Sequence, residues 1–160
     1  MNIAKSLKVG IGFGLSSAAI TTLGLIVGLD ASTGSRLAVI GGVLTIAVAD
    51  AFSDALGVHV AKELEGNFSD LEIWQATIST LLLKFVFACT FLIPIILLPM
   101  NLAIIAALIW GAIILVAVSY FSAKDKNQKP GAIIFEHLSI AVVVIVITYF
   151  LGQFIAKVFI

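Results

Sequence analysis

The sequence has few charged residues. Only 11% of its 160 residues are Asp, Glu, Lys or Arg, whereas 61% are hydrophobic. A soluble domain of this length has about a quarter charged and about half apolar residues. The low charge therefore excludes an ordinary soluble domain. Basic and acidic residues number 9 each, which leaves no basic surface for nucleic acid.

Cysteine and histidine are also scarce. The single cysteine, Cys89, lies inside an apolar run, so it forms no intrachain disulfide and indicates no redox compartment. The two histidines, His59 and His137, are isolated, and no Ser–His–Asp or metal-hydrolase pattern surrounds them. We therefore expect neither enzymatic activity nor a bound cofactor.

Long apolar runs, by contrast, occupy most of the chain. A helix that crosses the hydrocarbon core of a bilayer needs about 20 predominantly apolar residues. The predicted spans are approximately 9–29, 37–60, 72–98, 102–121 and 132–160. The sequence thus predicts an all-α integral membrane protein with five transmembrane helices, in which residues 1–160 form a single transmembrane domain.

Two details of these runs need separate mention. The first apolar run follows Lys5 and Lys8 and is long enough to span, so we interpret it as a span rather than a cleavable signal peptide. In the third span, Pro94 is expected to kink the helix, because proline lacks the backbone N–H.

The basic residues indicate an orientation, because cytoplasmic segments are enriched in Lys and Arg. A cytoplasmic N-terminus puts six basic residues inside and two outside. The inner residues are Lys5, Lys8, Lys62, Lys124, Lys126 and Lys129, and the outer ones are Arg36 and Lys157. We therefore expect a multi-pass protein of the cell membrane, with its N-terminus inside and its C-terminus outside.

Two carboxylates lie inside the second predicted span. Asp50 and Asp54 are one helical turn apart, so they share a helix face. Each ionisable side chain near the bilayer centre costs roughly 2.5–3.5 kcal/mol on insertion scales. One interpretation is an ion or proton pathway, and the other is an ion pair with a basic residue that only locks the helices together.

The third span contains one basic residue, Lys84, on the same helix face as Thr77 and Thr80. It lies about 18 Å along the helix from Glu72, which is near the middle of a membrane. Because an acid and a base in a membrane offset each other's cost, we expect Lys84 to pair with Asp50. An arriving cation then has to displace Lys84 or remove its proton.

Other acidic residues lie near the ends of the spans. Glu63 and Glu65, in the predicted loop 61–71, either gather cations at the mouth of the second span or simply face solvent. Glu136, early in the last span, either contacts the cation or pairs with a loop lysine, and we favour the pairing. His59 falls nearly opposite Asp50 on a helical wheel, so we expect it to pack rather than to bind a ligand.

Small residues form a seam along the first span. Their spacing alternates between four and three, so they share one helix face, where they allow a neighbouring helix to approach closely. The seam residues are Gly10, Gly14, Ser17, Thr21, Gly24 and Gly28. Their partner is either another span of the same chain or a second subunit.

Three short segments resemble motifs of the vacuolar iron transporter family. Residues 12–17 (Gly-Phe-Gly-Leu-Ser-Ser) resemble the family's first-span Asp-Gly-Leu-Val-Thr, and residues 49–53 (Ala-Asp-Ala-Phe-Ser) resemble its second-span Gly-Glu-Tyr-Val-Ser. Residues 147–152 resemble the end of its last span. The order of the motifs, the five spans and the basic loop before the last span strengthen the resemblance.

The resemblance implies a homodimer in the lipid bilayer that exports ferrous or manganous ions from the cytoplasm in exchange for protons. Asp50 takes the place of the second-span acid, and the seam is expected at the subunit contact. Phe13 stands where the family has its first-span Asp, Ile46 stands where a metal-contacting Met is often found, and the cytoplasmic insert is reduced to residues 61–71. Asp54 is a candidate to compensate for the missing acid. The alternatives are a transporter or channel for another solute, or a membrane subunit that transports nothing.

Overall fold

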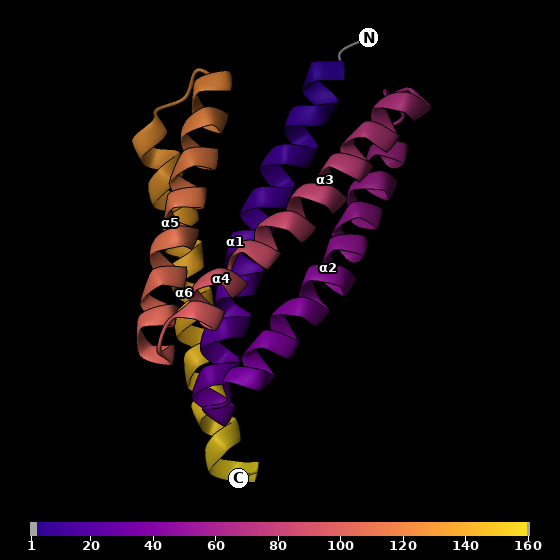
Figure 1. Ribbon diagram of the computed structural model, residues 1–160. Helices are drawn as coiled ribbons and strands as arrows, with labels where there is room; N and C mark the ends of the chain where they lie inside the picture. The colour runs from indigo at the N-terminus through magenta and orange to yellow at the C-terminus, as the bar shows by residue number, and fades with distance from the viewer. Residues whose placement is uncertain (1–2, 160) are drawn as a thin grey trace.

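The computed structural model describes residues 3–159 and is helical throughout its regular structure (Figure 1). Five helices are long and apolar enough to cross a membrane, because α3 and α4 together form one such segment. The helices are α1 (Ile3–Thr33), α2 (Arg36–Glu65), α3 (Asp70–Thr90), α4 (Leu92–Leu97), α5 (Met100–Asp125) and α6 (Pro130–Phe159). The prediction of five spanning-length helices is confirmed.

The helices extend further than the predicted spans. Residues 61–65, predicted as part of a loop, form the last turn of α2, so the predicted loop 61–71 is wrong over that stretch. Gly66 ends α2 in the left-handed conformation (φ 66°), which glycine adopts without steric cost. Ser69 then starts α3, and its backbone N–H donates to a Glu72 carboxylate oxygen at 3.0 Å. The last turn of α2 thus contains charged residues, so the helix extends beyond the end that hydropathy predicts.

The third segment is interrupted just before Pro94, where the sequence predicts a kink. An uninterrupted helix needs an N–H at position 94 to bond the carbonyl of Thr90, and proline has none. The break lies at Phe91, between α3 and α4. On the α5 side, the Trp110 indole N–H donates to the Thr90 hydroxyl oxygen at 2.8 Å, which fixes α5 against this break.

The seam on α1 packs within the chain. A Cβ added to Gly14 would lie 3.0 Å from the carbonyl oxygen of Thr80 on α3, and one added to Gly24 would lie 3.0 Å from Val144 on α6. The closest approach to a backbone atom is between α1 and α6, where a Cβ on Gly152 would lie 2.4 Å from the carbonyl oxygen of Gly28. The expectation of a subunit contact at these glycines is therefore not met, because α3 and α6 of the same chain fill that space.

Successive connections between the spanning helices lie at alternate ends of the bundle, as expected for a chain that crosses a membrane five times (Figure 1). Lys8 near the start of α1 pairs with Asp125 at the end of α5, at the end of the bundle where the N-terminus lies. At the opposite end, Arg36 donates to the carbonyl oxygen of Leu98 at 2.8 Å. The predicted inner and outer basic residues thus belong to opposite ends, while the choice of the cytoplasmic end stays a prediction.

Candidate cation site

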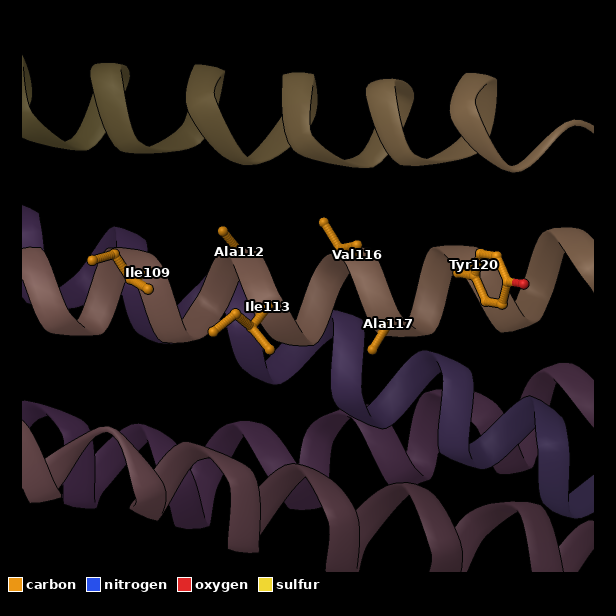
Figure 2. Close-up of a pocket in the computed structure, with 6 residues that line it drawn as sticks. All are labelled: Ile109, Ala112, Ile113, Val116, Ala117 and Tyr120. Carbon is orange, nitrogen blue, oxygen red and sulfur yellow. The ribbon is translucent and has the colours of Figure 1, made fainter.

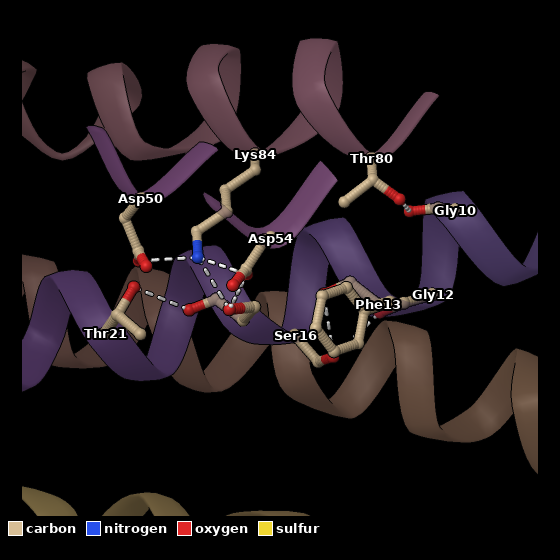
Figure 3. A network of polar contacts seen from close by, with 10 residues as sticks. Gly10, Gly12, Phe13, Ser16, Thr21, Asp50, Asp54, Thr80 and Lys84 are labelled. Atoms are coloured by element: carbon tan, nitrogen blue, oxygen red, sulfur yellow. Dashed lines mark hydrogen bonds and ion pairs between the residues drawn. The ribbon is translucent and has the colours of Figure 1, made fainter. Parts of the chain in front are cut away.

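Three helices meet at the ammonium group of Lys84 (Figure 3). The Lys84 side chain is 1% exposed, and its Nζ lies 2.5 Å from Asp50 Oδ2. Nζ also donates to Asp54 Oδ2 and, at 2.8 Å, to Ser17 Oγ. The predicted pairing of Lys84 with Asp50 is confirmed, and Asp54 joins it.

The local sequence explains how these groups reach one another. On α2, Asp50 and Asp54 lie at the edge of a buried stripe that includes Ala51 and Ala55. The small side chains of this stripe let α3 come close, so that the long Lys84 side chain reaches across to both carboxylates. Lys84 itself continues the buried polar face of α3, as the spacing from Thr80 predicts.

Ser17 is a member of the site that the sequence did not reveal. Its hydroxyl donates to Asp54 Oδ2 at 2.6 Å, so its oxygen is free to accept from Lys84 Nζ. Thr21 Oγ1 in turn donates to the Ser17 carbonyl oxygen at 2.8 Å. A hydroxyl group within a row of glycines indicated that Ser17 could bind a polar partner. The regular spacing of that row, however, predicted only a packing role for Ser17.

The site is buried at the lysine and open at the carboxylates. The Asp50 and Asp54 side chains are 27% and 19% exposed, against 1% for Lys84. Asp50 Oδ2 is itself buried and accepts no hydrogen bond of good geometry from the described residues, so its contact with Lys84 is an ion pair. With all three side chains ionised, the site carries one net negative charge. An approaching cation therefore meets carboxylate oxygens first.

Glu63 and Glu65, the candidates for gathering cations at the mouth of the second span, do not join this site. Glu63 lies nine residues after Asp54, which is half a turn around α2 and about 14 Å along it. Glu63 Oε1 lies 3.4 Å from His59 Nε2, and Glu65 Oε2 lies 3.6 Å from Lys62 Nζ. Within residues 3–159, no three His, Cys, Asp or Glu side chains form a metal-binding group.

The remaining predicted polar residues lie elsewhere. Glu136 is exposed and forms no ion pair with any basic side chain that the structure describes, so its predicted pairing with a loop lysine is not observed. His59 packs as predicted, with its Nδ1 3.0 Å from Thr77 Oγ1 and its ring edge-on to Trp74. Both lie outside the charged network of Lys84, Asp50, Asp54 and Ser17.

Neither Phe13 nor the apolar groove on α5 supplies polar groups to the site. Phe13 is 44% exposed and precedes Ser17 by one turn on α1. A groove of about 550 Å³ runs along α5 instead and is almost wholly apolar (Figure 2). Its lining residues are Ile109, Ala112, Ile113, Val116, Ala117 and Tyr120. Because a cation needs oxygen ligands, the network at Lys84 is the better candidate site.

No known protein family, curated protein or solved structure matches this chain.

Proposed function

We propose that this chain is a cell-membrane transporter that exports divalent metal ions, iron or manganese, from the cytoplasm in exchange for protons. The observation that supports it most directly is a pair of partly exposed carboxylates, Asp50 and Asp54, which both contact the buried ammonium group of Lys84. These groups lie on helices of spanning length. Intramembrane ionisable groups of this kind commonly mark ion or proton pathways.

The chemistry of the site suits this cargo. Mn²⁺ accepts carboxylate oxygen ligands, and a carboxylate also takes up the proton that is exchanged. Ser17 adds a hydroxyl oxygen beside Asp54. The resemblance of residues 49–53 to the second-span motif of vacuolar iron transporters supports the same class of cargo.

We propose further that two copies associate, as the resemblance implies. Because the α1 seam packs within the chain, a second copy needs another surface. The outer face of α2 offers exposed small residues at a spacing of four, beside Asp50 and Asp54. They are Gly41, Thr45, Ala49, Ser53 and Gly57. Small residues of this kind allow helices to associate closely in lipid.

A cysteine cross-link tests this association. In a Cys89→Ser background, Ser53→Cys is expected to form an intermolecular disulfide in membranes, because two copies of α2 then face each other. Leu44→Cys is the matched control, because Leu44 is exposed and lies half a turn around α2 from Ser53. Equal cross-linking of both variants, or none of Ser53→Cys, contradicts the dimer contact on α2.

Transport itself is tested with purified protein in liposomes that contain a pH-sensitive dye. We expect Fe²⁺ and Mn²⁺ to cross the membrane with proton movement in the opposite direction, and empty liposomes to show neither. Folded protein that moves no ion is the result expected of a subunit that transports nothing.

The charge of the site also favours a second candidate function. With Lys84 between the carboxylates, one net negative charge remains, and a single monovalent cation neutralises it. The same liposomes loaded with Na⁺ separate the two functions. Na⁺ flux without Mn²⁺ flux favours a monovalent-cation transporter on this scaffold.

A further inference from the structure

Lys84 occupies the space between the two carboxylates that a transported cation needs. Its ammonium contacts Oδ2 of both Asp50 and Asp54, and it is covalently attached to α3. Resting on the proposed function, we infer that Lys84 is a built-in counter-cation. It replaces the transported ion between the carboxylates while the empty transporter returns to bind the next ion.

The return step is costly without such a group. A transporter that has released its ion exposes two bare carboxylates to the membrane interior, and each uncompensated charge there is unfavourable. Lys84 reduces the charge of the empty site from two negative charges to one, and the exchanged proton, bound to a carboxylate, neutralises the remaining one. Because the lysine is part of the chain, it provides this compensation without being transported.

The geometry makes the ion-bound and lysine-bound states mutually exclusive. The ammonium contacts Oδ2 of each carboxylate, and its third partner is Ser17 on α1. With Lys84 bound, the site therefore links α1, α2 and α3 through one charged group. An ion that binds both carboxylates has to break these links, so it shifts the equilibrium between the two arrangements.

The inference is tested by comparing two kinds of flux in liposomes at equal pH on both sides. Net efflux of Mn²⁺ into an ion-free medium requires the empty site to return. Exchange of internal for external Mn²⁺ uses only the loaded site. Lys84→Met removes the charge, so we expect the ratio of net efflux to exchange to fall more than about tenfold relative to the wild type.

Two further variants separate charge from folding. Lys84→Met with Asp54→Asn again leaves one net negative charge, so we expect its flux ratio to return to within about threefold of the wild type. Lys62→Met is the matched control, because Lys62 is also buried but contacts Glu65 and Phe68 instead. Its flux ratio is expected to equal that of the wild type.

The flux ratios show whether Lys84 acts as the counter-cation. An unchanged flux ratio in Lys84→Met, or a ratio that the double variant fails to restore, overturns the counter-cation role. Loss of exchange in folded Lys84→Met overturns it too, since the lysine is then needed by the loaded site. Absence of both fluxes in the wild type refutes the proposed function itself, together with this inference.

Discussion

Removing the Lys84 charge should destabilise the protein more than removing either of its partners. At 2.5 Å, the attraction between Lys84 Nζ and Asp50 Oδ2 is about 7 kcal/mol at an effective dielectric constant of about 20, before desolvation is subtracted. Breaking a buried pair so that a charge stays unpaired costs about 3–5 kcal/mol. Lys84→Met leaves two such carboxylates, whereas Asp50→Asn leaves Lys84 still paired with Asp54.

These magnitudes define a double-mutant cycle. We expect Lys84→Met to cost about 3–5 kcal/mol and Asp50→Asn about 1–2 kcal/mol. The double variant should cost less than the sum of the two, because it lacks one of the unpaired carboxylates. The expected interaction energy is about 1–3 kcal/mol, within the range for residues in contact.

Thermal unfolding in detergent measures the cycle, with the fluorescence of Trp74 and Trp110 as the signal. For a chain of this size, 1 kcal/mol shifts Tm by about 2–4 °C, so Lys84→Met is expected to lower Tm by roughly 10 °C. Additive shifts in the double variant would show that Lys84 and Asp50 do not interact, and the site described above would then be wrong.

Two other predictions concern packing and orientation. Gly152→Ala places a methyl group against the Gly28 carbonyl and is expected to cost about 1–3 kcal/mol, whereas Gly12→Ala, with no atom within 4 Å of the added Cβ, should be neutral or stabilising when thermal unfolding is compared. A reporter enzyme active only outside the cytoplasm, fused to the C-terminus, is expected to be active; activity only of a cytoplasmic reporter would reverse the orientation.

The sequence predicted those features that depend on the free-energy cost of placing polar or charged groups in the membrane interior. Five apolar runs of about 20 residues or more predict five spanning-length helices, and Pro94 predicts the kink in the third of them. The pairing of Lys84 with Asp50 followed from the same reasoning, because neither charge is tolerated alone at that depth. Hydropathy did not predict where α2 ends, since Glu63 and Glu65 continue the helix in polar surroundings.

Features that depend on which helices meet were not available from one sequence. Helical periodicity showed that Gly14 and Gly24 share a face, but not that α3 covers one and α6 the other. Ser17 was missed as a site residue for the same reason, since its partners come from α2 and α3. The separation of Glu63 from Asp54, in contrast, follows from helix geometry and was predictable.

The central claim is that the carboxylates at Lys84 contact the transported ion, and Mn²⁺ efflux from liposomes through Asp50→Asn tests it most directly. Glu136→Gln is the matched control, because Glu136 is an exposed acid outside the network. We predict that the efflux rate of Asp50→Asn falls more than about tenfold while its Tm falls by no more than the roughly 2–8 °C that a loss of about 1–2 kcal/mol gives, and that Glu136→Gln keeps the wild-type rate. Wild-type efflux through folded Asp50→Asn would contradict the claim and leave the network a purely structural one.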